Sequence, residues 1–349
     1  TALGHAALIV NTASNNTAAG WLSLSANTSG ANNTGIGVQS LAANTTASNN
    51  TAVGCGALLA NTTGSQNNAF GRNALDANTT ASYNNAFGHG TLGLNTTGSE
   101  NTGMGDGVLA NSTTASFNTA VGSAALYANT TGASNTAVGK NAMLLNTTGA
   151  DSTAVGKGAL AANTTGNDNT AVGFSALVTN TTGAVNAAFG GYSLYGNTTG
   201  ANNTAVGISS LENNTTGTAN TAVGFRSLKN NTTGIQSVAV GNVALDALTT
   251  GNQNVALGSS ALGAVTTGSG NIGIGQNSAG GGLTTGSNNI TIGQNSGGDA
   301  MRALAASSSN EIVMGNTNNS VAYIKIDWTV VSDLRDKTEI KNVTHGLDF

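Results

Sequence analysis

Residues that could do chemistry are scarce in this chain and unevenly placed along it. Only 7% of the 349 residues are charged, and ten of the 24 charged residues follow position 302. Acid–base pairs, or a nucleophile with its base, need several polar side chains held close together. Because the first 300 residues carry few charged residues and no recurring set of them, we expect no active site for an external substrate there.

Metal and thiol chemistry are also not indicated. His5, His89 and His345 occupy unrelated positions and do not suggest a metal site, and the Asp-rich glycine repeat of calcium-binding β-rolls is missing. We therefore expect no metal and no cofactor. The lone cysteine, Cys55, excludes an intrachain disulfide and lies just after a glycine of the repeat described below. A reactive thiol needs an electropositive setting, so we interpret Cys55 as a small turn residue.

Charge and hydropathy exclude two classes of partner. The net charge of −4 offers no basic field for nucleic acid or an anionic membrane. No stretch reaches the roughly 18 apolar residues of a membrane-spanning helix. The chain begins inside a repeat, at Thr1-Ala2-Leu3-Gly4, so we interpret it as a fragment of a longer protein.

A 17-residue repeat must position whatever functional residues there are. Its clearest form is Asn-Thr-Ala-Val-Gly, as at 169–173, and the closing glycine recurs through fifteen consecutive 17-residue intervals from Gly20 to Gly275. Gly4 precedes this series and Gly293 follows it. Only stacking of each unit on the one before penalises a slip at every step. The sequence therefore predicts an all-β fold, a parallel β-solenoid (β-roll) of 17-residue repeats.

Positions within a rung are counted from this glycine, taken as zero. Position −1 is apolar, as in Val206, and shares one strand face with position −3, which is usually Thr or Ala. Position +4 is Leu or Met, as in Leu211. We predict that −1 and +4 form the core. Position −2 is nearly always Ala or Gly, as in Ala205, and we predict that a neighbouring chain packs closely against it.

The remaining residues of the rung indicate turns. The zero glycine and the Asn-Thr-Thr-Gly segment that begins at +7 are expected to be two left-handed corners, with the Asn side chains stacked in a hydrogen-bonded ladder. Glycosylation of the Asn-x-Thr sequences in a secretory host is the alternative. Regular Thr rows could instead order water, as on an ice-binding solenoid. Trp21 and Tyr192 each interrupt the pattern, either as repeat irregularities or as rings that stack on a sugar.

The rod resembles the head repeats of trimeric autotransporter adhesins. The residues that carry this resemblance are 237–241 (Ser-Val-Ala-Val-Gly) and 271–275 (Asn-Ile-Gly-Ile-Gly). In that family, short strand units form a β-roll in each of three chains. The resemblance implies a homotrimer, although the present repeat is a few residues longer.

The C-terminal segment resembles the opening of the intramolecular chaperone domain of phage tailspikes and tail fibres of the endosialidase type. The pattern Ser-Asp-x-Arg-x-Lys-x-x-Ile is met at every fixed position of 332–340. In that family the chaperone trimerises the chain and then cuts itself off. The resemblance implies cleavage between Ser332 and Asp333, with Ser332 as nucleophile and Lys337 as its base. The alternative is a charged connector.

These observations predict three segments and a structural role. We expect a solenoid shaft over 1–298, a terminal strand and connector over 299–331, and a truncated chaperone over 332–349. The function expected is an extracellular fibre shaft, from a phage tail fibre or a bacterial surface fibre. It would be no enzyme apart from a single self-cleavage, and its partners would be its own copies and a host surface glycan or receptor at a tip. The alternative is a single-chain ice- or surface-binding solenoid.

Overall fold

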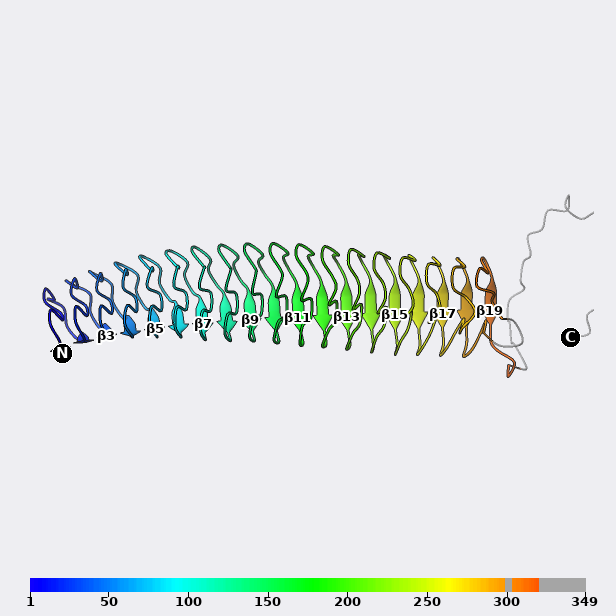
Figure 1. The fold of residues 1–349 in the computed structure, drawn as a ribbon, viewed down its shortest axis with the longest axis horizontal. Coiled ribbons are helices and arrows are strands. Elements are labelled where there is room, and N and C mark those ends of the chain that lie inside the picture. The colour runs from blue at the N-terminus through cyan, green and yellow to red at the C-terminus, as the bar shows by residue number, and fades with distance from the viewer. Residues whose placement is uncertain (299–302, 320–349) are drawn as a thin grey trace, which may run out of the picture.

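The chain folds into a parallel β-solenoid, as expected. The computed structural model describes residues 1–298 and 303–319, and within these ranges it contains strands and turns and no helix. Figure 1 shows one row of strands along the length of the rod, with the turns forming its other sides. The predicted all-β class and the 17-residue repeat are therefore confirmed.

Each rung contributes one short strand to a single sheet. Successive strands pair in parallel with a shift of one repeat, for example Thr204 with Thr221 and Val206 with Val223. The final strand follows a longer loop and pairs with the strand before it, so the last strand expected near 310–315 continues the same sheet. The strands are β1 (Ala2–Leu3), β2 (Thr17–Ala19), β3 (Thr34–Ile36), β4 (Thr51–Val53), β5 (Asn68–Phe70), β6 (Asn85–Phe87), β7 (Thr102–Met104), β8 (Thr119–Val121), β9 (Thr136–Val138), β10 (Thr153–Val155), β11 (Thr170–Val172), β12 (Ala187–Phe189), β13 (Thr204–Val206), β14 (Thr221–Val223), β15 (Val238–Val240), β16 (Val255–Leu257), β17 (Ile272–Ile274), β18 (Ile290–Ile292) and β19 (Ile312–Met314).

The core holds the strand alanine and the turn leucine of each rung, which corrects the predicted facing of the strand. Ala205 and Ala222, at −2, have no exposed surface, and neither does Leu211, at +4. Val206, at −1, is 38% exposed. The prediction that −1 faces the core and that −2 faces another chain was wrong, whereas +4 was assigned correctly.

Lack of space explains why position −2 is small. The inward side of the strand packs against the residues at +3 and +4 of the chain's own turns. Where −2 is glycine, an added Cβ would lie 2.6 Å from Ser23 Oγ at Gly35 and 2.6 Å from Leu262 Cγ at Gly273. The restriction to Ala and Gly does reflect close packing, but the packing partner is the same chain.

The left-handed residues of the rung agree only in part with those expected. From Gly4 to Gly293 the zero glycine has φ between 116° and 142°, and a Cβ at Gly207 would lie 2.5 Å from the carbonyl oxygen of Gly224, so this corner is confirmed. The Asn at +7 and the Gly at +10 are not left-handed. Instead the buried Leu at +4 has φ of 50–55° in successive rungs, as Leu211 does. Its conformational cost is about 1–2 kcal/mol, and burying the side chain contributes about 1.5–3 kcal/mol.

Two asparagine ladders run through the rod. At +7, Asn61 Nδ2 donates to Asn44 Oδ1 at 2.9 Å and to the Gly64 carbonyl at 2.9 Å, which confirms the predicted ladder. At +13, Asn50 Oδ1 accepts from the backbone N–H of Asn67 at 2.9 Å, an interaction that the sequence did not suggest. Because the +7 amides are buried and hydrogen-bonded, these asparagines have no room for a glycan in the folded rod.

Candidate interaction surface

The described rungs do not assemble a catalytic set. Ser332, Lys337 and His345 lie outside the described residues. His5 and His89 belong to rungs far apart, and His89 forms an exposed pair with Asp106 at 3.1 Å. Within 1–298 and 303–319, no three His, Cys, Asp or Glu residues gather where they could hold a metal ion. Cys55 is exposed, just after its glycine.

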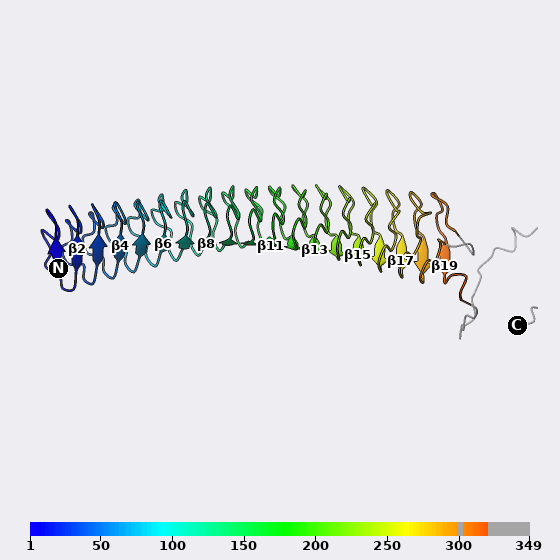
Figure 2. The same ribbon diagram turned by 60° about the horizontal axis from the view of Figure 1, so that its bottom comes forward.

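The main candidate for an interaction surface is the outer face of the strand row, which we call the strand face. It consists of the side chains at −1 and −3. At −1 an apolar side chain stands half-exposed in nearly every rung, so the row follows the whole length of the sheet. Figure 2 shows the strands that carry it, side by side along the rod. Its most exposed members, each at least 36% exposed, are Leu3, Ile36, Phe70, Met104, Val138, Val155, Phe189, Val206, Val240, Leu257, Ile274, Ile292 and Met314.

Threonine accompanies this apolar row over much of its length. Thr204 and Thr221, at −3, are half-buried, point outward beside Val206 and Val223, and pair in register. Among the described residues, no charged side chain occupies −1 or −3. The strand face is therefore uncharged, with an apolar row and a hydroxyl row in parallel. Toward the C-terminal end, −3 becomes Val238, and later isoleucine, so the face becomes fully apolar there.

Neighbouring rungs reinforce the order of this face. Phe70 and Phe87, at −1 of adjacent rungs, stack with ring centroids 4.9 Å apart and planes 6° apart. Such a separation matches the roughly 4.8 Å spacing of neighbouring strands. The sequence pattern identifies these residues as one row, but the prediction that this row lies in the core was wrong. The signal that could have corrected it was the restriction to Ala and Gly at −2, which marks the more crowded side.

The other faces are formed by turns that are mostly polar, with scattered exposed apolar side chains such as Leu94, Leu145 and Ile208. The first threonine after the +7 asparagine hydrogen-bonds along the stack, as Thr62 Oγ1 does to the Thr79 carbonyl at 3.0 Å. The second, such as Thr63, is exposed. Charged residues are few on these faces, and some form ion pairs, such as Arg226 with Asp246 at 3.3 Å. Another charged residue, Asp76, is half-buried, and this burial raises the pKa of its carboxyl above the usual value.

Comparison with known proteins identifies no family. No family model matches the chain, and no curated protein matches it either. In the part of the chain that the structure describes, no helix is both long and apolar enough to cross a membrane. A function must therefore be inferred from the surfaces of the rod.

Proposed function

We propose that this chain is the shaft of a homotrimeric extracellular fibre, from a phage tail or a bacterial surface, that holds a binding tip away from its particle or cell. The observation that carries the proposal is the continuous apolar row at −1 of the strand face. A monomeric soluble protein rarely leaves a contiguous apolar patch of more than a few hundred Å² uncovered. A partner that covers this row must be as long as the row, and a second copy of the chain has that length.

The area of the row supports an interface between copies. Its side chains, each about two-fifths exposed, together present on the order of 1,000 Å², compared with about 800 Å² per partner in a standard interface. The face also carries no charge that would have to be desolvated. Three rods whose strand faces point to a common axis would cover all three rows. The number three comes from the resemblance to adhesin heads and to tail-fibre chaperones.

Light scattering on the chain tests the proposal. We expect three times the chain mass of 34.0 kDa. The double variant Val206→Glu, Val240→Glu places charges on the strand face two rungs apart and is expected to give folded monomer. Its matched control, Thr182→Glu with Thr216→Glu, has the same spacing on an exposed turn and should remain trimeric. A monomeric parent, or a trimeric Val206→Glu, Val240→Glu variant, would refute the interface.

A single-chain ice- or surface-binding solenoid is the second candidate, and the threonines at −3 favour it. They lie on the strand face and not only at a corner, in register at about 4.8 Å spacing. Such a hydroxyl row beside an apolar row could order a water layer. A monomer in solution that shows thermal hysteresis would support this candidate over the fibre. A trimer without thermal hysteresis would exclude it.

The resemblance of 332–340 adds a maturation step to the fibre proposal. The chaperone would assemble three chains and then be released by cleavage between Ser332 and Asp333, with Lys337 as the base for Ser332. Expression of the full-length gene carrying Ser332→Ala should leave the C-terminal segment attached, which mass spectrometry of the product would show. Normal release from that variant would exclude Ser332 as the nucleophile.

A further inference from the structure

Two rows of exposed side chains border the strand face. The row at +1 follows each strand across the zero glycine, and the row at +12 precedes the next strand across the buried residue at +13. We call these rows the +1 border and the +12 border. Each strand thus carries one residue of either border, and the six residue steps between them span at most about 20 Å.

Four charged residues occupy the two borders at one level of the rod. Lys140 and Lys157 belong to the +1 border, and Asp151 and Asp168 belong to the +12 border. The lysines and aspartates alternate along the chain, so both pairs lie at the level of β9 to β11. All four side chains are exposed, and none forms an ion pair with another described residue. Lys157 Nζ lies 5.7 Å from the centroid of the Phe174 ring, a contact that leaves its N–H donors free.

This placement of charge is unfavourable in a single rod. The two lysines stand in adjacent rungs about 4.8 Å apart, and so do the two aspartates. Like charges in register on adjacent strands are destabilising. Elsewhere at +1, the acidic Asp106 instead pairs with His89 of the preceding rung at 3.1 Å. Two like-charged stacks of opposite sign, on opposite borders, indicate that each stack meets the other on a neighbouring molecule.

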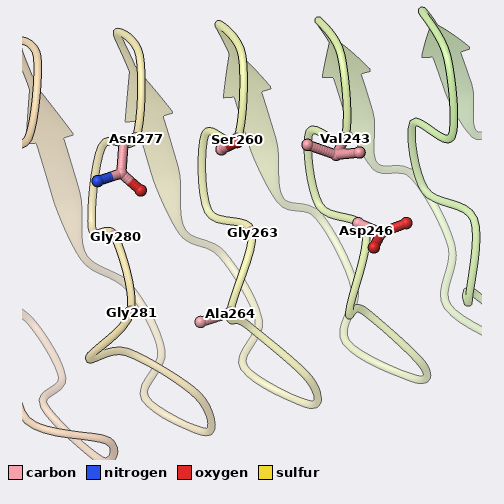
Figure 3. Close-up of a pocket in the computed structure, with 8 residues that line it drawn as sticks. All are labelled: Val243, Asp246, Ser260, Gly263, Ala264, Asn277, Gly280 and Gly281. Atoms are coloured by element: carbon pink, nitrogen blue, oxygen red, sulfur yellow. The ribbon is translucent and has the colours of Figure 1, made fainter.

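Charged residues on the turns find partners within the chain. Figure 3 shows the rows at +2 and +5 beside one open depression of about 340 Å³ in the rungs of β15 to β17. Side chains of these two rows can therefore reach each other. Arg226 and Asp246 pair in this way at 3.3 Å, and Lys229 Nζ lies 3.6 Å from Glu212 Oε2. The border charges lack such a partner because the strand face separates the two borders.

We propose that copies of this chain associate in parallel and without stagger, with the +1 border of each copy against the +12 border of the next. Lys140 and Lys157 of one copy then meet Asp151 and Asp168 of its neighbour. The inference rests on the proposed homotrimer, to which it adds the direction, the register and a second set of contacts. An apolar centre with a polar rim is also the usual anatomy of an interface between proteins.

The match between the borders extends one rung further. Phe174 follows the lysines in the +1 border, and Val185 follows the aspartates in the +12 border. Both side chains are apolar and exposed. A parallel, unstaggered arrangement therefore places opposite charges together and apolar side chains together over three consecutive rungs.

Other arrangements bring these charges together less well. In an antiparallel pair with facing strand rows, each border meets its own kind, so lysine faces lysine. A shift of several rungs would place the lysines opposite uncharged residues of the +12 border, such as Asn202 and Ala219. In a closed ring of three parallel rods, each copy gives its +1 border to one neighbour and its +12 border to the other, so every border is covered.

Sedimentation of charge-reversed variants at low ionic strength tests the inference. Lys140→Glu with Lys157→Glu makes both borders acidic, and Asp151→Lys with Asp168→Lys makes both basic. Each double variant should weaken assembly at least about tenfold, because like charges then meet at every contact. The quadruple variant restores opposite charges and should assemble as the parent does.

The matched control is Thr148→Glu with Thr165→Glu. These exposed threonines lie at +9 of the same rungs as the lysines, away from both borders. This variant adds two acidic side chains, as the lysine reversal does, and should assemble as the parent does.

Cross-linking measures the register directly. Ser123 belongs to the +1 border and Ser134 to the +12 border, and both are exposed. In a Cys55→Ser background, Ser123→Cys with Ser134→Cys should give covalent trimers with a short bis-maleimide. Ser123→Cys with Asn202→Cys should give none, because Ser123 follows β8 whereas Asn202 precedes β13.

The inference is overturned if both double variants assemble as the parent does, or if the quadruple variant stays as weak as they are. It is also overturned if the threonine control weakens assembly equally, or if Asn202→Cys cross-links as well as Ser134→Cys. A trimeric parent with any of these results leaves the proposed fibre standing, since that proposal is judged by the parent mass and by Val206→Glu with Val240→Glu. A monomeric parent overturns both.

Discussion

Ser112→Asn is expected to stabilise the rod, because it repairs a break in the +7 asparagine ladder. In the rungs on either side, position +7 is Asn95 and Asn129. Asn95 Oδ1 and Ser112 Oγ are both buried without a hydrogen-bond partner. Asn129 Nδ2 donates only to the Gly132 carbonyl, whereas Asn146 Nδ2 also donates to an asparagine below it. The serine is too short to reach either neighbour.

The magnitude follows from the hydrogen bonds that an asparagine at 112 would make. Its Nδ2 would donate to Asn95 Oδ1, and its Oδ1 would accept from Asn129. Elsewhere the same ladder bonds measure 2.6–3.1 Å. Each bond contributes about 0.5–1.5 kcal/mol, so the variant should gain about 1–3 kcal/mol. The backbone needs no change, because an asparagine already occupies +7 in a rung of the same turn sequence. Asn78 is followed by Thr-Thr-Ala, as Ser112 is, and donates to the Ala81 carbonyl.

Hydrogen exchange of the peptides covering 92–130, together with guanidinium unfolding, measures this effect locally and globally. Local exchange is the sharper readout, since a solenoid need not unfold in one step. Ser112→Ala isolates the loss of the unpartnered hydroxyl and should change stability little. Leu248→Asn is the contrasting variant: its amide could donate to Asn231 Oδ1, but its own oxygen would face Val265 and find no donor. If Ser112→Asn protects these amides no better than Ser112→Ala, the reasoning is refuted.

Three further predictions concern the facing of the strand, the glycine corner and the titration of a half-buried carboxyl. Ala205→Glu should prevent folding of its rung, whereas Val206→Glu should leave the fold intact, because only the alanine is enclosed. Circular dichroism measures both, and equal effects would contradict the assignment of Ala205 to the inner face and Val206 to the outer face. Gly207→Ala should destabilise the rod by at least about 3 kcal/mol through backbone strain and a clash. Gly90 has a φ of 60° but no neighbouring atom within 4 Å, so Gly90→Ala should cost only the backbone strain of about 1–2 kcal/mol in the same unfolding assay. Burial raises the pKa of Asp76, so the folded state binds its proton more tightly, and stability should rise as pH falls through that pKa toward the ordinary pKa of an aspartate carboxyl. Asp76→Asn should remove this rise, and a parent curve that falls over the same range would show the sign to be wrong.

The sequence predicted the register of the fold but not the facing of its strands. A 17-residue period without a slip admits few structures other than stacked rungs, so the parallel sheet and the +7 ladder could be anticipated. Alternation within a three-residue strand identifies which residues share a face, but not which face is inside. Hydrophobicity alone favours Val206 over Ala205 as the core residue. The structure reverses this because the turn leucine fills the interior and leaves room only for a methyl group.

The left-handed leucine at +4 lay beyond sequence reasoning for a related reason. The recurrence of leucine at +4 indicates a buried anchor. Because leucine rarely adopts positive φ, nothing in the sequence indicates that its backbone is left-handed. Only the closed rung shows that the turn must reverse direction there while its side chain points inward. Tyr192 and Tyr195 flank this leucine, three residues apart in sequence, and nothing in the pattern alone indicates that their rings approach each other to 5.7 Å.

The buried asparagines explain how so thin a core can hold one register. Alanine and leucine rows would tolerate a slipped rung, since apolar contacts are not directional. The amide oxygen at +7 accepts from the amide of the next rung at the same height, so a slip leaves buried acceptors unpaired at about 1–3 kcal/mol each. The chain replaces this ladder only at its C-terminal end, where Leu248, Val265 and Leu283 follow one another and all are buried. Because these three replacements are consecutive, only one amide oxygen of the ladder, that of Asn231, is left without a partner there. The single replacement at Ser112 instead interrupts the ladder on both sides.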